Sequence, residues 1–199
     1  MSSGTIAVVV VALVIIIAVV TAIAMMTRSR RLRRQFGPEY DRAVDEQQSR
    51  LRAEAELTDR QRRVRKLDIK PLSDAARTKY AAAWVAIQER FVDAPDAAVT
   101  DAYSLVTTVM TERGYPIDDD EQVLGDLSVE HAQTVGHFRA AREITRNAAA
   151  GNAATEDLRQ ALIHYRVLFA DLLGEPDGAA IGTPASNQPD PASSYGGTP

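Results

Sequence analysis

The residues best suited to chemistry in this sequence are a run of four carboxylates and three histidines. The carboxylates Asp118–Glu121 are consecutive, whereas an EF-hand loop alternates its ligands and needs a glycine at its sixth position. Gly125 falls at the eighth position, so the run indicates the start of a helix instead. His131, His137 and His164 lack the spacing of three or four residues that places two ligands on one helix face. We therefore expect histidines at the surface or at helix ends, and no metal site.

Signatures of other chemistries are missing from the sequence as well. The chain has no cysteine, which excludes disulfides, thiolate ligands and cysteine nucleophiles. It has no glycine-rich phosphate loop, no G-x-S-x-G motif and no H-E-x-x-H motif. We expect a protein without a cofactor or a catalytic site, and therefore not an enzyme.

Two side-chain patterns have an ordinary structural explanation. Tyr80 and Trp84 follow helical spacing and are typical of a core rather than a ligand pocket. Arg139, Arg142 and Arg146 form a strip at spacings of three and four along one helix. A solvated face is the main interpretation of this strip, and contact with an acidic partner segment is the alternative.

The densest charged motif in the chain is the arginine cluster RSRRLRR, which directly follows a long apolar run. Such a cluster stops transfer and sets the orientation of a membrane protein. It is also attracted to anionic headgroups, by about 1 kcal/mol for each Lys or Arg near the surface. Both roles stay open, and the predicted membrane-surface contacts are Arg28, Arg30, Arg31, Arg33 and Arg34.

The apolar run Thr5–Met26 is predicted to be a transmembrane helix. Its 22 residues carry no charge and would span about 33 Å, enough for a hydrocarbon core of about 30 Å. In lipid only a helix satisfies the backbone of a single segment, which outweighs the strand preference of its many Val and Ile residues. A cleaved signal peptide is the alternative, because the segment Ala22–Ala24 resembles a cleavage site.

Charge sets the predicted orientation and excludes one class of partner. Positive residues stay cytoplasmic and the residues before the run have no charged side chain, so we predict an external N-terminus and a cytoplasmic C-terminal domain. Residues 28–70 hold 14 basic and 8 acidic residues, whereas residues 71–199 hold 9 basic and 19 acidic residues. This acidic distal part would repel phosphates, so nucleic acid is not expected as a partner.

Helices must position these residues, because no stretch alternates apolar and polar side chains as a strand would. Gly37 and Pro38 are expected to end the membrane helix and to form a hinge. One long polar helix is then predicted over Pro38–Lys66, either as a solvated stalk or as half of a coiled coil. A linker follows, and Ser73 at its end is the predicted N-cap of the next helix. Amphipathic helices are predicted at about Asp74–Val92, Pro95–Arg113, Val129–Ala149 and Glu156–Leu173, with a short one inside Ile117–Leu127.

The expected fold class is all-α. Residues 1–27 form the transmembrane anchor and residues 28–70 the basic juxtamembrane segment with the long polar helix. Residues 71–174 form an antiparallel bundle of the four-helix type, because short loops join its helices. Residues 175–199 are rich in Gly, Pro, Ser and Ala and are expected to be a disordered tail.

Several motifs together resemble a family of uncharacterised single-pass membrane proteins from high-GC Gram-positive bacteria, which are often labelled "secreted". They are FGPEYDR at Phe36–Arg42, LDIKPLS at Leu67–Ser73, RGYP at Arg113–Pro116 and DLSVEH at Asp126–His131. The resemblance covers roughly residues 5–173, and the chain departs from the family pattern at Asp120, where an aromatic residue is usual. The resemblance implies a single-pass architecture and no particular activity.

These observations lead to one main expectation about function and one alternative. The main expectation is a membrane-anchored cytoplasmic helical module that binds or scaffolds a protein partner at the inner membrane face. The alternative is a sensor of anionic lipid surfaces that acts through the basic juxtamembrane segment. The identity of the partner and the oligomeric state are open at this stage.

Overall fold

The computed structural model describes residues 3–174, and within this range every regular element is an α-helix. The all-α prediction is therefore confirmed for the described part of the chain. The predicted tail, residues 175–199, lies outside it. The eight helices of this range are α1 (Ser3–Phe36), α2 (Pro38–Gln47), α3 (Arg50–Val64), α4 (Asp74–Arg90), α5 (Pro95–Arg113), α6 (Asp120–Glu130), α7 (Val135–Ala149) and α8 (Thr155–Leu173).

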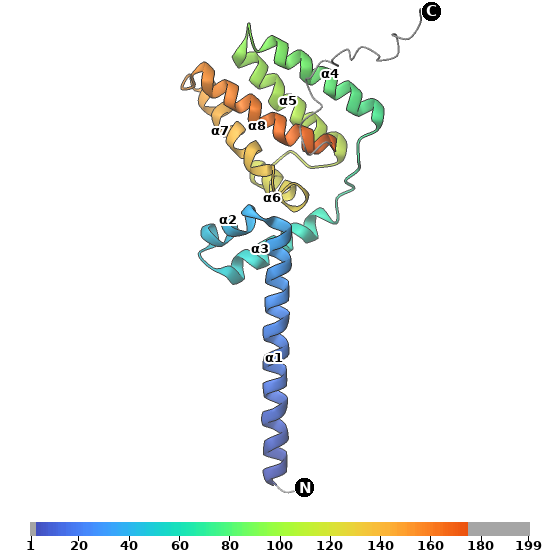
Figure 1. Cartoon of the computed structure of the whole chain (residues 1–199), viewed down its shortest axis with the longest axis vertical. Helices are drawn as coiled ribbons and strands as arrows, with labels where there is room; N and C mark the ends of the chain where they lie inside the picture. The colour runs from blue at the N-terminus through green and yellow to red at the C-terminus, as the bar shows by residue number, and fades with distance from the viewer. Residues whose placement is uncertain (1–2, 175–199) are drawn as a thin grey trace, which may run out of the picture.

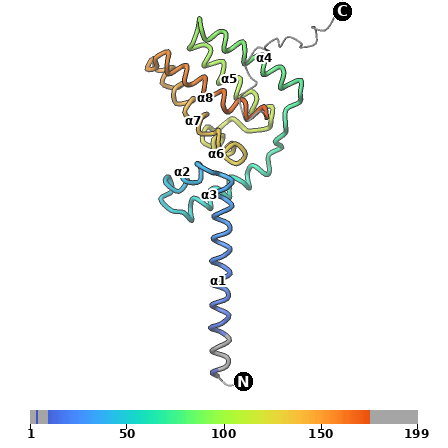
Figure 2. Tube along the Cα trace, viewed as in Figure 1, coloured from blue at the N-terminus to red at the C-terminus, as the bar shows by residue number. Residues whose placement is uncertain are grey.

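α1 projects far beyond the rest of the molecule (Figures 1 and 2). Every residue from Val10 to Met26 is exposed, although this stretch is strongly apolar. By length and composition α1 is long and apolar enough to cross a membrane. It continues without interruption to Phe36, and Gly37 (φ +47°) then breaks it, as predicted.

The single long helix predicted over Pro38–Lys66 is wrong. α2 ends at Gln47, Gln48 adopts a left-handed conformation (φ 49°), and α3 folds back against α2. Folding back buries apolar side chains of both helices, such as Tyr40 and Leu57, which one straight helix would leave exposed. We call residues 28–64 the collar; its apolar cluster joins the end of α1 to both helices through Leu32, Phe36, Tyr40, Ala43, Ala53 and Leu57.

α4–α8 form a second unit, which we call the distal domain. In it α8 packs between α5 and α7, and α4 covers α5 (Figure 1). Trp84 is fully buried and its ring stacks on Phe169 with 4.8 Å between centroids, so the predicted core role of this tryptophan is confirmed. Other fully buried side chains of this core are Val106, Val109, Met110, Phe138, Tyr165 and Leu168.

The helix predicted over Val129–Ala149 begins too early, because α6 extends to Glu130 and α7 begins only at Val135. Ser128, the predicted N-cap, lies inside α6 and its hydroxyl donates to the Gly125 carbonyl at 2.6 Å. α6 is buried over six consecutive residues between α3 and the distal core. Burial on several faces removes the periodic pattern from which helix bounds are predicted.

The linker between the collar and α4 packs against the end of α5. Gly114 caps α5 as predicted, with φ +98°, and a Cβ there would lie 2.5 Å from the Asp68 carbonyl oxygen. The Lys70 amide donates to the Arg113 carbonyl at 2.8 Å. Ser73 accepts from the Ala76 amide at 3.2 Å, so the predicted cap of α4 is also confirmed.

Candidate functional site

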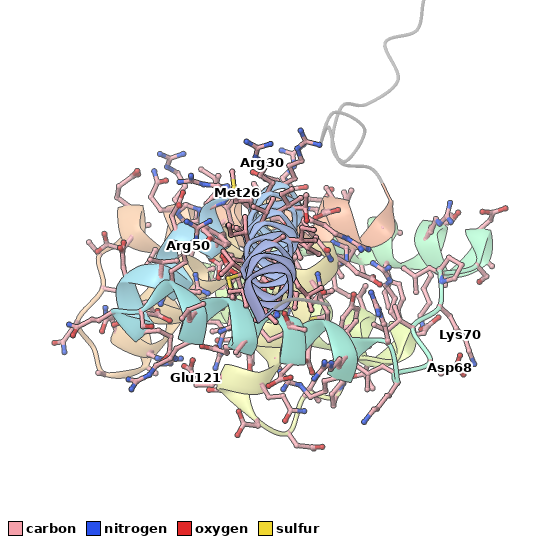
Figure 3. The ribbon with its side chains drawn as sticks, turned by 90° about the horizontal axis from the view of Figure 1, so that it is seen from below. Met26, Arg30, Arg50, Asp68, Lys70 and Glu121 are labelled. Carbon is pink, nitrogen blue, oxygen red and sulfur yellow. The ribbon has the colours of Figure 1, made fainter. Side chains whose placement is uncertain are left out.

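The structure divides the five predicted membrane-surface arginines between two faces of α1. Arg30, Arg31 and Arg34 lie on the face that the rest of the collar leaves uncovered, and together with Thr27 and Gln35 they line a shallow open groove. None of these three guanidinium groups has an ion pair or hydrogen bond with any described residue. Seen along α1, Arg30 lies on the side of the helix away from α3 (Figure 3). Three uncompensated cations therefore face solvent within eight residues of Met26, the last residue of the apolar run.

The other two arginines of the cluster bind the protein itself. The Arg28 guanidinium donates to the Thr58 hydroxyl at 2.8 Å and to the Glu54 carbonyl at 3.4 Å, both on α3. The Arg33 guanidinium pairs with the Asp41 carboxylate of α2 at 2.8 Å. These contacts hold α2 and α3 against α1, so Arg28 and Arg33 have structural partners that sequence alone did not indicate.

A polar cluster lies beneath these contacts, where all three helices of the collar meet. The Tyr40 hydroxyl donates to the buried Glu54 carboxylate at 2.9 Å and lies 3.2 Å from the Ser29 hydroxyl. Arg50 donates to Glu54 at 3.0 Å. Burial would raise the pKa of Glu54, but hydrogen bonds from Ser29, Tyr40 and Arg50 outweigh it and lower the pKa. The cluster therefore holds a charged glutamate and stabilises the collar.

Two ion pairs join the collar to the distal domain. Both terminal nitrogens of Arg139 on α7 donate hydrogen bonds to the Glu39 carboxylate of α2, at 2.9 and 3.0 Å. Arg63 of α3 donates to the Asp126 carboxylate of α6 at 2.7 Å. Glu39 is 5% exposed and Asp126 is fully buried. A buried carboxylate is costly without its partner, so both pairs restrain how the two units sit relative to each other.

The basic strip of α7 is largely neutralised within the chain. Beyond the pair made by Arg139, Arg142 binds the Asp120 carboxylate at the start of α6, and Arg146 lies 3.4 Å from Glu143. Arg142 is only 5% exposed, so the interpretation of the strip as a solvated face is wrong at this position. The strip joins α7 to α2 and α6.

The carboxylate run lies at the N-terminus of α6, as predicted. α6 begins at Asp120, and the Asp119 carboxylate accepts from the Gln122 amide at 2.8 Å. Within the described residues no group of three or more His, Cys, Asp or Glu side chains is arranged to hold a metal ion.

His131 is the C-cap residue of α6, but it is buried rather than on the surface. Its Nδ1 lies 2.9 Å from an Asp171 carboxylate oxygen, and its Nε2 lies 3.2 Å from the Arg113 guanidinium. Burial would raise the pKa of Asp171, but hydrogen bonds from His131 and Thr134 outweigh it and lower the pKa. An aspartate also orients the histidine of a catalytic triad. Here the second ring nitrogen faces a guanidinium instead of a nucleophile, and the cluster joins α5, α6 and α8.

Sequence reasoning missed the pairing of His137 on α7 with His164 on α8. Their Nδ1 atoms lie 2.9 Å apart, so one ring donates a hydrogen bond to the other. The pKa of His164 is lowered mainly by burial and, to a smaller extent, by the nearby His137. The two residues stand at similar distances along the chain from the turn between α7 and α8. Treating these helices as a hairpin would have predicted the contact.

Of the charged side chains described above, the uncovered arginines of α1 are the ones without an ion pair or hydrogen bond to any described residue. The buried clusters have partners within the chain and contribute to packing and orientation. Comparison with known proteins adds no assignment, because no family model, no curated protein and no solved structure matches this chain. The geometry of the collar must therefore support any proposal about function.

Proposed function

We propose that the chain is a single-pass membrane protein that holds a four-helix-type bundle in a fixed position at the inner membrane face, as a scaffold for a protein partner. The observation that carries this proposal is that the end of α1 belongs to the core of the collar. Leu32 is 3% exposed and Phe36 is fully buried. A scaffold requires such a rigid mount, because a flexible tether would leave the orientation of the bundle undefined.

Further contacts support a rigid mount in place of the hinge expected at Gly37. The Gln35 side chain donates to the Val129 carbonyl of α6 at 3.2 Å and accepts from Gln61 of α3 at 2.6 Å. Rotation at Gly37 would break these bonds together with the contacts of Arg28 with α3 and of Arg33 with α2. It would also expose the buried side chains of Leu32 and Phe36, and this cost opposes such rotation.

The five arginines after the apolar run support a cytoplasmic location for the bundle. A fluorescent protein fused to the C-terminus is expected to fluoresce, and alkaline phosphatase fused there is expected to be inactive. The reverse pair of results would place the bundle outside and contradict the proposal.

Photo-crosslinking in intact cells tests the scaffold itself. A crosslinking amino acid is placed at three exposed apolar positions of the distal domain, Val85, Val92 and Ile163. We expect a discrete protein adduct from at least one position, and its loss when a Gly-Ser segment inserted after Phe36 loosens the mount. Absence of protein adducts from all three positions, or an unchanged adduct after the insertion, would contradict a rigid scaffold.

A second candidate function is recognition of anionic lipid, favoured by the three uncovered arginines of α1. At about 1 kcal/mol for each cation near a charged surface, they would contribute about 3 kcal/mol together. Replacing Arg30, Arg31 and Arg34 with glutamine should reduce the enrichment of phosphatidylglycerol around the protein in mixed nanodiscs, as measured by native mass spectrometry. Replacing Arg28 and Arg33 is the matched control, because their guanidinium groups bind the protein. Equal enrichment in both variants would eliminate this role.

A further inference from the structure

The point at which α3 contacts α1 sets the height of α3 above the apolar segment of α1. Arg50, in the first turn of α3, bonds to the Ser29 hydroxyl, and Arg28 reaches the middle of α3. Ser29 follows Met26, the last apolar residue of the run, by three positions. At 1.5 Å per residue it lies about 4.5 Å beyond Met26 along the helix. The polar layer on each side of a bilayer is about 5–8 Å thick, so this crossing falls inside that layer.

One face of α3 is free at this height. α2 and α6 cover the face that carries Ala53, Leu57 and Val64. The opposite face carries Leu51, which is 70% exposed, and Arg62, which is also exposed. α2 and α3 are the part of the folded domain nearest the projecting length of α1 (Figure 1). Seen from below along α1, α3 lies across the domain with its lower side uncovered by any other helix (Figure 3).

The side chains near this face suit a lipid headgroup layer. Arg52, the residue after Leu51, is exposed and has no ion pair with any described residue. Asp59 is the carboxylate of the free face, and it pairs with Arg62 at 3.3 Å. An exposed leucine beside an uncompensated cation is typical of helices that lie in a membrane interface.

We infer that the first turns of α3 lie in the headgroup layer, with Leu51 inserted at the boundary of the acyl chains and Arg52 in contact with lipid phosphates. This inference rests on the proposal that α1 spans a membrane. It adds a second area of contact, which fixes the tilt of the domain as well as its height. One spanning helix alone would leave the domain free to tilt relative to the membrane normal.

A fluorescence experiment on the full-length chain tests this inference. Since the protein has no cysteine, single cysteines can be labelled with an environment-sensitive fluorophore at chosen sites. The test position is Leu51→Cys, with Ile16→Cys inside the apolar run as the buried reference. Val92→Cys is the control in solvent, because this residue is 83% exposed at the turn between α4 and α5, far from α1. The labelled variants are inserted into vesicles of phosphatidylcholine and phosphatidylglycerol in which both leaflets carry nitroxide lipids.

We expect nitroxide quenching of the Leu51 probe at least about twofold stronger than that of the Val92 probe, together with a blue-shifted emission. Quenching of the Leu51 probe no stronger than that of the Val92 probe, while the Ile16 probe is quenched, would overturn the position of α3 and leave the anchor intact. If the Ile16 probe also escapes quenching, the anchor itself is wrong. Because both leaflets carry the nitroxide quencher, the result does not depend on which way the protein inserts into the vesicle. Unchanged emission of Trp84 in each variant shows that the distal core remains folded.

Discussion

Replacing Phe36 with alanine is expected to release the collar while leaving the distal core folded. The ring is fully buried among Leu32, Tyr40 and Leu57, and this cluster is separate from the core around Trp84. Truncation of a buried phenylalanine costs about 3–5 kcal/mol, from lost burial and from the cavity left behind. Alanine favours a helix, so the loss reports packing and not helix propensity.

Hydrogen exchange of the full-length protein in nanodiscs measures this loss by region. The expected cost corresponds to a decrease in amide protection of roughly two to four orders of magnitude. It should be confined to α2, α3 and the last turns of α1. The amides of α5 and α8, which belong to the other core, should keep their protection. Near-UV emission of Trp84 should likewise remain that of a buried ring stacked on Phe169.

Ile163→Ala provides the matched control, since this apolar side chain is 41% exposed. A surface truncation of this kind should change stability by no more than about 0.5 kcal/mol. Unchanged protection of α2 and α3 in the Phe36 variant would refute the claim that the end of α1 is part of the collar core. An equal loss of protection throughout α2–α8 would refute the separation of the two cores.

Three further predictions concern single interactions. Arg139→Met should destabilise the protein by about 3 kcal/mol in urea unfolding, because it leaves the buried carboxylate of α2 without its bidentate partner. Gly114→Ala should lower the melting temperature more than Gly151→Ala: both positions have positive φ, but only the first places a Cβ against the linker backbone. His164 should make stability fall as pH decreases through about 6.5, since its pKa is lower in the folded state than in the unfolded state and the unfolded chain binds the extra proton. The melting temperature should therefore drop more between pH 7.5 and 5.5 in the wild type than in His164→Gln.

Each of these predictions has an outcome that contradicts it. A loss below about 0.5 kcal/mol for Arg139→Met would show that the pair with Glu39 does not hold the two units together. Equal melting temperatures for the two glycine variants would show that the linker moves away from Gly114 at no cost. An identical pH response of the wild type and His164→Gln would show that burial and the nearby His137 do not lower the pKa of His164.

Local signals in the sequence predicted much of the architecture. The apolar run, the break at Gly37, the cap at Ser73 and the stop at Gly114 all depend on residues within a few positions of one another. The regular apolar stripe of the helix ending at Leu173 likewise predicted its bounds to within one residue. Such features follow from backbone hydrogen bonding and helical periodicity, which operate over one or two turns.

Errors occurred where distant residues decide the outcome. The sparse stripe of Pro38–Lys66 shows that little apolar surface is available, but it does not show that the chain reverses at Gln48 to cover it. α6 was misjudged because helix α3 buries the side that would otherwise be polar. Helix propensity and periodicity describe one helix at a time, whereas the burial of a side chain depends on which other element packs against it.

The candidate site shows the same division. Sequence alone determined that an apolar helix is followed at once by five arginines, and this order of charge and hydrophobicity is sufficient to predict a membrane anchor. Only the tertiary structure decided that Arg28 and Arg33 bind α3 and α2, while Arg30, Arg31 and Arg34 stay uncovered. The physical reason is that a helix distributes consecutive side chains around its axis. Which of them are free depends on the partners that pack against it, and the chain supplies those partners from segments far away in sequence.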